Sequence, residues 1–137
     1  MQEVLTIHIV IEGCDTLKSP RGQINMIRFG GWCDCDCFKG KVLSGGVDTQ
    51  MYLNGQPGQL SARYMLEGTD AKGKPAKLFI ENNGIFGDDG ECITHPNIHT
   101  DSENLRWLCE MPLRGTITGW EQGVVIHMYQ DEAATGE

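Results

Sequence analysis

The 137-residue chain carries 11 Lys and Arg residues against 19 Asp and Glu residues, which gives a formal net charge of −8 with His neutral. The basic residues are scattered and form no concentrated cationic face, which argues against nucleic acid as a partner. The longest apolar run is far shorter than the ~20 residues of a membrane-spanning helix, and the N-terminus lacks the cationic region of a signal peptide. We therefore expect a cytoplasmic protein with no membrane partner.

The chain is long enough to bury one hydrophobic core without disulfides or metal. We expect a single domain over residues 1–130, followed by a flexible polar tail over residues 131–137. Eighteen glycines with only five prolines, and 39% hydrophobic residues, favour a turn-rich β protein over a disordered one.

Strand-like patterns dominate the chain. Residues 4–11 place Leu5, Ile7 and Ile9 on one face and Thr6 and His8 on the other, the period of two that is typical of a half-buried strand. Similar patterns predict strands over residues 23–29, 47–53, 59–67, 77–82, 113–120 and 123–130. The Asn-Gly pair at 54–55 favours a hairpin between the strands on either side of it, because both residues tolerate positive φ.

Residues 82–104 do not fit this scheme. They are rich in Gly, Asp and His and only weakly periodic, so we expect a long functional loop there. A short helix is expected near residues 102–105, with Asp101 or Ser102 as its N-cap. With antiparallel neighbours and little helix, the economical all-β architecture is a single antiparallel β-barrel of about 8–10 strands, which removes exposed sheet edges. A barrel of about eight strands can hold one small ligand.

Five stretches occur in a characteristic order: SPRGQINMIRFGG, FKGKVLSGGVDTQ, LSARYMLEGTDAKG, LFIENNG and RGTITGW with GVVIHMYQ. Over residues 3–130 they resemble the DUF3237 (UPF0311) family of uncharacterised small proteins. The most specific pieces are Gly30-Gly31, the GGVDTQ run at 45–50 and the pair Arg63-Tyr64. The resemblance implies a lipocalin- or calycin-like barrel and, from some relatives, polyketide-like or aromatic ligands. It implies no settled activity.

The GGVDTQ run and the strand that follows it supply the main candidate site. Asp48, Gln50 and Tyr52 share one strand face, and Arg63 and Tyr64 lie on the next strand. If the hairpin pairs these strands, Arg63 and Asp48 could meet in the lumen and orient a polar ligand, with Gln50, Tyr52 and Tyr64 as further ligand contacts. Alternatively, the polar face is an ordinary solvated surface, or Asp48 and Arg63 form a buried pair that only fixes the barrel.

Further candidates come from His, Asn and Trp residues. His8 and His127 lie in the middle of predicted strands and could act as general bases near neutral pH, although a strand histidine is more often structural; of the two, His127 is our catalytic candidate. Asn82 could bind a ligand at a strand mouth, but Asn-Asn-Gly is also good turn chemistry, which we favour. Trp107, beside the predicted loop, is our candidate for a wall on which a ligand stacks.

Six cysteines are many for a cytoplasmic protein of this size. If the CDCDC run at 33–37 is extended, its three thiols project to one face at a spacing unfavourable for disulfides, and Asp34 and Asp36 face water. We interpret these cysteines as small apolar wall residues, with metal binding or redox chemistry as alternatives. Cys92, His95 and His99 have a spacing that could hold zinc but lack a fourth ligand nearby, so we predict no metal site.

The leading hypothesis is a protein that binds a small organic molecule in the barrel lumen. The sequence leaves open whether it is an enzyme; cofactor-free acid/base chemistry of the cyclase, isomerase or lyase type is the class we favour, with Asp48 or His127 moving the proton and Arg63 stabilising negative charge. The alternatives are a non-catalytic ligand-binding protein and a metal- or redox-responsive protein. We expect no cofactor. A homodimer is compatible with a barrel of this size, but the sequence identifies no interface.

Overall fold

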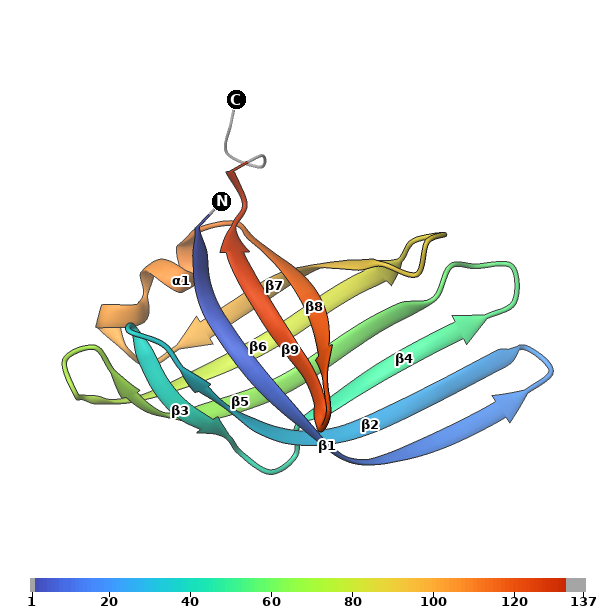
Figure 1. Cartoon of the computed structure of the whole chain (residues 1–137), viewed down its shortest axis with the longest axis horizontal. Helices are drawn as coiled ribbons and strands as arrows, with labels where there is room; N and C mark the ends of the chain where they lie inside the picture. Colours follow the sequence, from blue (N-terminus) through green and yellow to red (C-terminus); the bar gives the residue numbers. More distant parts are fainter. Residues whose placement is uncertain (1, 133–137) are drawn as a thin grey trace.

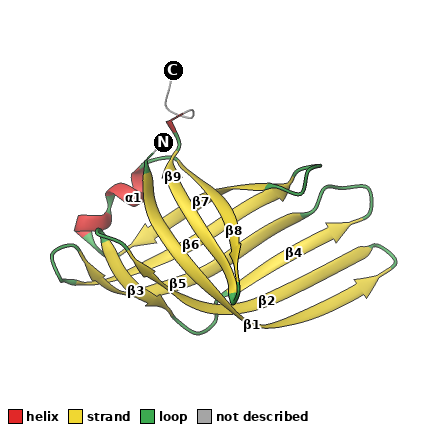
Figure 2. Ribbon diagram, viewed as in Figure 1, coloured by secondary structure: helices red, strands yellow, loops and turns green. Residues whose placement is uncertain are grey.

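The computed structural model describes residues 2–132 and consists mainly of antiparallel β-strands (Figure 1). The strands are β1 (Glu3–Ser19), β2 (Gly22–Asp34), β3 (Phe38–Val42), β4 (Val47–Leu53), β5 (Gln59–Asp70), β6 (Pro75–Phe86), β7 (Cys92–Thr100), β8 (Leu113–Trp120) and β9 (Gly123–Gln130). Between β7 and β8 lie a 3-10 helix, η1 (Glu103–Leu105), and one turn of α-helix, α1 (Trp107–Glu110), at one end of the molecule (Figure 2). Neither helix is long and apolar enough to cross a membrane.

The nine strands form one sheet that closes on itself. The order is β1-β9-β8-β7-β6-β5-β3-β2-β4, with additional pairings of β1 with β2 and of β5 with β4. β3 and β4 share one position in the ring, because each pairs with β2 on one side and with β5 on the other. The predicted all-β antiparallel barrel is therefore confirmed, and its strand number lies within the predicted range.

The closure is uneven around the ring. β8 opposes β9 along its whole length, and β6 opposes β7 over nine residue pairs. In contrast, Thr94 and Gly115 are the single opposed pair between β7 and β8 in the described part of the chain. We call this join the β7–β8 seam. β1 and β2 also continue past the end of the β8–β9 hairpin, where β2 still pairs with β4 but β1, beyond Val10, no longer pairs with β9. The barrel is open on that side, and we call the concave side of this open part of the sheet the trough (Figure 1).

The hydrophobic core fills the other end of the barrel, towards α1. The predicted inward face of the first strand is confirmed there, since Leu5, Ile7 and Ile9 are buried. η1 and α1 place Leu105 and Leu108, each 1% exposed, in the same cluster. The helical segment thus contributes core residues at this end.

One local expectation is wrong, and a second is confirmed in part. Residues 82–104 are not a long loop, because β6 continues to Phe86 and β7 covers Cys92–Thr100, joined by a short Gly- and Asp-containing turn. The strand pattern of β7 is hard to recognise in the sequence, because polar His and Asn residues occupy its outer face. Its inner face carries Thr94, Pro96 and Ile98, which are buried. The short helix expected near residues 102–105 is present as η1, with Ser102 at the N-cap position, but the Ser102 side chain makes no cap hydrogen bond. The polar tail predicted over 131–137 lies, from residue 133 on, outside the described residues.

Candidate functional site

The candidate site lies on the inner wall of the barrel. Opposed residues on neighbouring antiparallel strands point to the same side of a sheet. Asp48 on β4 opposes Ile27 on β2 and Ala62 on β5, and Ala62 in turn opposes Asn82 on β6. Ala62 and Asn82 are buried, at 9% and 2% exposure, so this row faces the interior. Tyr64, two residues beyond Ala62 on β5, lies on the same face and is 4% exposed.

The two glycines of the GGVDTQ run determine how Asp48 enters the barrel. They end the segment 43–46, which carries the chain from β3 to β4. Gly45 has a φ of 105°, which residues with side chains rarely adopt. A Cβ on Gly46 would lie 3.1 Å from the Phe29 carbonyl oxygen and 3.2 Å from Tyr64 Cβ. Because Gly46 has no side chain, the backbone can pass close to Phe29 and Tyr64, and β4 begins at Val47 with Asp48 directed inward.

A cavity of about 100 Å³ lies beside this row. Apolar side chains of β1, β2 and β9 form much of its wall, and β4, β5 and β6 add the polar groups of Asp48, Gln50, Tyr64 and Asn82. Three buried atoms in this lining, Asp48 Oδ1, Tyr64 OH and Asn82 Oδ1, have no hydrogen-bond partner among the described residues. Most buried polar atoms in proteins are paired, so three unpaired atoms around one cavity indicate a place for a polar ligand or water.

The cavity also perturbs its acidic groups. Burial raises the pKa of the Asp48 carboxyl, and a hydrogen bond of 3.0 Å from Gln50 Nε2 to Asp48 Oδ2 acts in the opposite direction. Burial likewise raises the pKa of the Tyr64 hydroxyl, which therefore remains a hydrogen-bond donor at neutral pH. A carboxyl group with a raised pKa beside a cavity is suited to proton transfer.

Gln50 and Tyr52 connect this buried site to the trough. The Tyr52 hydroxyl donates a hydrogen bond of 3.0 Å to Gln50 Oε1, and Gln50 in turn donates to Asp48. The Tyr52 ring is 39% exposed and stacks on Phe86, with 5.8 Å between the ring centroids. Tyr52 thus lies at the mouth of the site rather than in the cavity.

Sequence reasoning missed the part of the wall formed by β2, where Ile27 and Phe29 line the cavity and Asn25 lies farther along the same strand face. Asn25 opposes Gln50, and its Oδ1 accepts hydrogen bonds from Thr16 Oγ1 at 2.9 Å and from Gln23 Nε2 at 3.1 Å. The alternation of residues 23–29 already placed Asn25 with Ile27 and Phe29. This alternation would have identified the wall if the large apolar side chain of Phe29 had been taken to mark the inner face of the strand.

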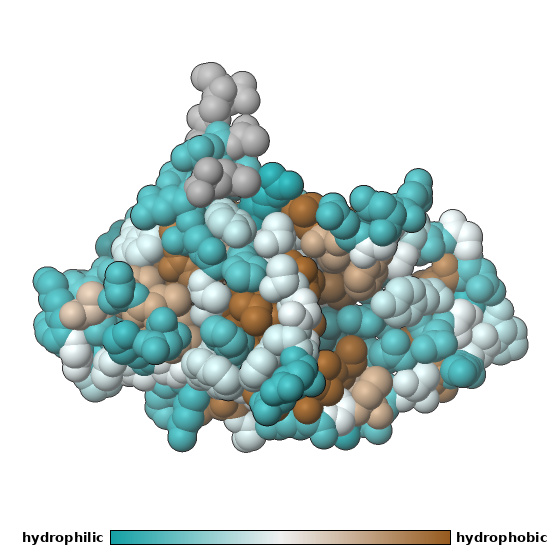
Figure 3. All heavy atoms as spheres, viewed as in Figure 1, coloured by the Kyte–Doolittle hydropathy of each residue, from teal (hydrophilic) through white to brown (hydrophobic). Residues whose placement is uncertain are grey.

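The rim of the cavity is apolar beside the β8–β9 hairpin. Ile11 lines the cavity and is 48% exposed, and its N–H donates to the Gln122 carbonyl in the β8–β9 turn at 3.0 Å. Hydrophobic side chains reach the surface beside the end of this hairpin (Figure 3). An entering molecule would therefore meet apolar surface on this side and the polar groups of β2 and β4 on the other.

Arg63 and His127 lie outside the barrel, so their predicted place in the lumen is wrong. Arg63 opposes Val47, one residue out of phase with Asp48, and its guanidinium binds Glu81 at 2.8 Å with the side chain 65% exposed. His127 lies between inward-facing residues of β9; its Nδ1 lies 2.8 Å from Glu3 Oε2 and its Nε2 3.0 Å from Thr118 Oγ1. Both residues point outward because side chains alternate strictly along a strand and the neighbours of each residue point inward.

Asn82 and Trp107 also depart from expectation, whereas His8 fits the structural alternative. His8 lies on the outer face, stacked on Trp32 with ring centroids 4.9 Å apart. Asn82 lies within β6 rather than in a turn, which leaves its side chain free to line the cavity. Trp107 is on α1 and lines a different pocket, together with Cys35, so it forms no wall of the lumen cavity.

The Cys92, His95 and His99 set forms no metal site. Cys92 opposes Phe86 on β6, and His95 and His99 are an odd number of residues away along β7, so they point to the other face. The described residues contain no group of three or more His, Cys, Asp or Glu side chains placed to hold a metal ion.

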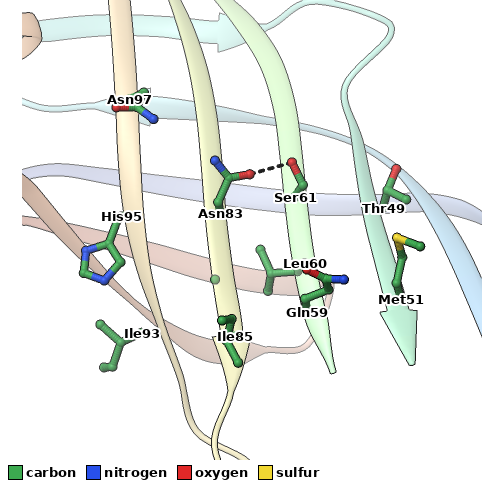
Figure 4. Close-up of a pocket in the computed structure, with 11 residues that line it drawn as sticks. Thr49, Met51, Gln59, Leu60, Ser61, Asn83, Ile85, Ile93, His95 and Asn97 are labelled. Atoms are coloured by element: carbon green, nitrogen blue, oxygen red, sulfur yellow. Dashed lines mark hydrogen bonds between the residues drawn. The ribbon is translucent and has the colours of Figure 1, made fainter. Parts of the chain in front are cut away.

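A larger hollow lies on the outer face of β4–β7 (Figure 4). It is an open groove of about 580 Å³, with Met51, Ile85 and Ile93 among its lining residues. Its polar groups include Ser61, whose hydroxyl donates to Asn83 Oδ1 at 2.6 Å. No lining residue of this groove has a buried unpaired polar atom among the described side chains. The inner cavity is therefore the stronger candidate, although it is smaller.

Comparisons with known proteins agree with this architecture. The family model described as "Protein of unknown function (DUF3237)" matches residues 1–93. A UPF0311 protein of Clostridium acetobutylicum is 36% identical over 89 residues, which cover 61% of this chain and 52% of that protein, so the chain spans about half the length of this curated relative.

Solved structures extend the similarity over nearly the whole chain. A protein of unknown function from Clostridium acetobutylicum is 26% identical with a TM-score of 0.78, and the match covers 94% of this chain and 96% of that one. A beta-barrel-like protein from Acinetobacter baumannii, 17% identical, has the same fold with a TM-score of 0.72 over 94% of this chain and 93% of its own. Because the family model matches well over half of its residues, the chain belongs to the DUF3237 family of proteins of unknown function.

Proposed function

We propose that the protein binds a small, uncharged organic molecule that places a hydroxyl or carbonyl group in the lumen cavity. The observation that carries this proposal is the convergence of three buried, unpaired polar atoms, on Asp48, Tyr64 and Asn82, around one cavity. Leaving a buried polar atom unpaired costs about 1–3 kcal/mol. A ligand with both a donor and an acceptor would offset that cost.

The lining of the cavity narrows the ligand class. Its walls include Ile9, Ile27 and Phe29, and its lining residues include no Lys or Arg. An anionic ligand would therefore lack a counter-ion, whereas a neutral one would gain apolar contacts. A volume of about 100 Å³ accommodates a small group, and the rest of a larger molecule would extend past Gln50 towards Tyr52. Aromatic hydroxyketones, including flavonoids and polyketide-like compounds, have these properties.

Proton-transfer catalysis is a second candidate, favoured by the raised pKa of Asp48. The Asp48 carboxylate would remove a proton next to a ligand carbonyl, and the Tyr64 hydroxyl would donate a hydrogen bond to the enolate oxygen that develops. This assigns to Tyr64 the charge-stabilising role first expected of Arg63. Isomerisation, cyclisation and lyase reactions all include such a step, and none of these protein groups requires a cofactor for it. We infer a cytoplasmic setting for this activity.

The binding proposal is tested by a thermal-shift screen of neutral flavonoids and aromatic hydroxyketones, followed by calorimetric titration of the compounds that stabilise the protein. Tyr64→Phe removes one donor from the cavity, and we expect it to weaken binding about five- to tenfold, the value of a typical hydrogen bond. Asn83→Ala is the matched control, because Asn83 neighbours Asn82 on β6 but faces the outer groove.

Two results would contradict the lumen site. One is a compound whose affinity falls in Asn83→Ala but not in Tyr64→Phe, since that would place binding in the outer groove. The other is binding of anionic compounds that is lost in Arg63→Ala.

The catalytic candidate has a separate measurement. A bound ketone should exchange its α-protons with deuterated water faster in the presence of the protein, as followed by NMR. Asp48→Asn should abolish this acceleration while binding persists. Acceleration that persists in Asp48→Asn would show that Asp48 is not the base, and a wild type that gives no acceleration would be a binding protein without this chemistry.

A further inference from the structure

The CDCDC run does not form the extended strand segment expected from the sequence. β2 ends at Asp34, and Cys35, Asp36 and Cys37 form the turn to β3, closed by a hydrogen bond of 2.9 Å from the Cys35 N–H to the Phe38 carbonyl. Both aspartates are exposed, as predicted. The turn changes the spacing of the thiols, which an extended strand would have held apart.

Cys33 and Cys35 are brought into contact by this turn. Their sulfur atoms lie 3.4 Å apart, with the Cys33 thiol donating to Cys35 Sγ. The Thr6 N–H donates a second hydrogen bond to Cys35 Sγ at 3.3 Å. The two thiols differ in access, since Cys33 is 2% exposed whereas Cys35 lines an open pocket of about 510 Å³. This pocket, at the α1 end, is distinct from the lumen cavity.

We propose that Cys35 and Cys33 act as an attacking and a resolving thiol that reduce small disulfides entering this pocket. The geometry supplies both requirements of such a pair. The accessible sulfur accepts two hydrogen bonds, which stabilise its thiolate, and the buried sulfur already touches it. Closing the gap to the ~2.05 Å of a disulfide requires movement of a short turn rather than of a strand paired on both sides.

The reaction balances in two exchanges. The Cys35 thiolate attacks one sulfur of a low-molecular-weight disulfide, whose S–S bond breaks and whose first thiolate leaves and takes a proton from solvent. Cys33 then loses its proton and attacks Cys35 Sγ, which displaces the second thiolate, protonated in the same way. The protein dithiol is oxidised to a disulfide by two electrons, and the small disulfide is reduced to two thiols.

The pocket selects among such disulfides. Glu3 and Asp36 contribute carboxylates to its wall, while Trp107 and Met111 contribute apolar surface. An uncharged or cationic disulfide with an aromatic or alkyl body fits this lining better than an anionic one. The probe of choice is therefore dipyridyl disulfide, which is neutral and aromatic and releases a coloured thiopyridone.

The neighbouring groups bear on the pH dependence of the attack. The hydrogen bond from Cys33 lowers the pKa of Cys35 to about 6, aided by the Thr6 N–H and opposed by burial and by the carboxylates of Glu3 and Asp34. The same hydrogen bond, together with burial, raises the pKa of Cys33, so Cys33 loses its proton only after Cys35 has become a mixed disulfide and carries no negative charge. Burial also raises the pKa of the nearby Cys37 thiol. The rate at Cys35 should therefore reach half of its plateau near pH 6, well below the ~8.5 of an ordinary cysteine.

The experiment uses the full chain with Cys14, Cys92 and Cys109 changed to Ser, which leaves only the cysteines of the CDCDC run. One equivalent of dipyridyl disulfide should release two thiopyridones per protein and leave no adduct, and peptide mass spectrometry should locate a Cys33–Cys35 disulfide. In the same background, Cys33→Ala should release one thiopyridone, retain the pyridyl adduct on Cys35 and shift the pH midpoint upward. Cys37→Ala, the matched control, should behave like its parent.

A second variant separates the two roles of Cys33. Cys33→Ser keeps a donor to Cys35 but cannot form a disulfide, so the adduct should persist while the pH midpoint stays low. It also serves if Cys33→Ala does not fold, as judged by circular dichroism. The proposal is overturned if the parent keeps a stable adduct, if the disulfide joins Cys35 to Cys37, or if Cys37→Ala rather than Cys33→Ala blocks resolution.

Discussion

Asp48 shows how one buried carboxyl can serve function at the expense of stability. Its Oδ2 accepts a hydrogen bond from Gln50, its Oδ1 has no partner among the described residues, and its pKa is raised by burial. A raised pKa means that the folded protein binds the proton more tightly than the unfolded chain does. The stabilising contribution of Asp48 is therefore complete below the unfolded pKa of ~3.9 and is lost as the pH rises through the folded pKa.

We predict that Asp48→Asn is more stable than the wild type at pH 7 and equally stable near pH 3. The amide keeps the shape of the carboxyl and an acceptor for Gln50 but has no charge to bury. The gain should amount to about 1.4 kcal/mol for each unit by which burial raises the pKa. Thermal melts between pH 3 and pH 8 measure it, with Asp88→Asn in the exposed β6–β7 turn as the control. A wild type that is the more stable protein at pH 7 would contradict this account.

Whether a site residue predicted from the sequence lies inside the barrel depends on its position in the inward–outward alternation of its strand. Asp48 and Gln50 belong to the inner wall because period-two alternation fixes which residues share a face. Arg63 was misplaced because alternation within one strand does not give the register between two strands. Placing it required the pairing of Val47 with Arg63, which depends on how the segment 43–46 connects β3 to β4.

At the scale of elements, Asp70 links the β5–β6 turn to the helical segment. Its carboxylate accepts hydrogen bonds from the N–H groups of Lys72 and Lys74, at 2.9 and 3.0 Å, from Ser102 Oγ at 3.2 Å and from Asn104 Nδ2 at 2.9 Å. The hydrogen bond from Asn104, followed by those from the turn and from Ser102, lowers the pKa of this carboxyl. The hairpin at 70–73 therefore has a structural role that its sequence did not reveal.

We predict that Asp70→Ala melts at a clearly lower temperature than the wild type at pH 7, and that Asp70→Asn lies between them. A lowered folded pKa contributes stability above the unfolded value of ~3.9, and that contribution is lost as the pH falls through the folded pKa. The difference between the wild type and Asp70→Ala should therefore narrow below pH 4. Glu103→Gln, an exposed change in the same segment, should leave the melting curve unchanged. A constant difference from pH 7 to pH 2 would show that the charge of Asp70 is not involved.

Which elements could be predicted depended on how clearly their two faces differ. β4, β8 and β9 have the predicted bounds, because turn residues flank a clean alternation. β7 was missed, because His95, Asn97 and His99 on its outer face and Pro96 on its inner face disguise an otherwise regular strand. α1 was missed as well, because one helical turn is too short to show a 3.6-residue period.

For the molecule as a whole, the β7–β8 seam is the join in the ring with the fewest opposed residue pairs among the described residues. Apart from the Thr94–Gly115 pair, β8 is held through its ladder with β9, and β9 through its ladder with β1. A Cβ on Gly115 would lie 2.3 Å from Thr94 Oγ1. The two strands therefore pack closely at this point, although Thr94 and Gly115 are their single opposed pair in the described part of the chain. Local opening should require the least free energy at this join.

We predict that backbone amides of β8 exchange with deuterated water faster than those of β6, which is paired along both edges. Exchange followed by mass spectrometry of peptides covering residues 113–120 and 75–86 makes this comparison. Gly115→Ala, which crowds Thr94, should speed exchange in the first peptide more than in the second. Equal protection of the two peptides would mean that packing alone closes the seam.

The seam also bears on how the barrel is completed during synthesis. β1 opposes β9 in pairs such as Ile7 with Ile126, so the first strand must wait for the last one before it gains its second neighbour. If the earlier strands pair first, the chain from β1 to β7 would form an open sheet with β1 along one border and β7 along the other. Pairings so distant in sequence form slowly, and unpaired borders attract other chains. The interval before the β8–β9 hairpin docks is therefore the stage at which a nascent molecule is most exposed to aggregation.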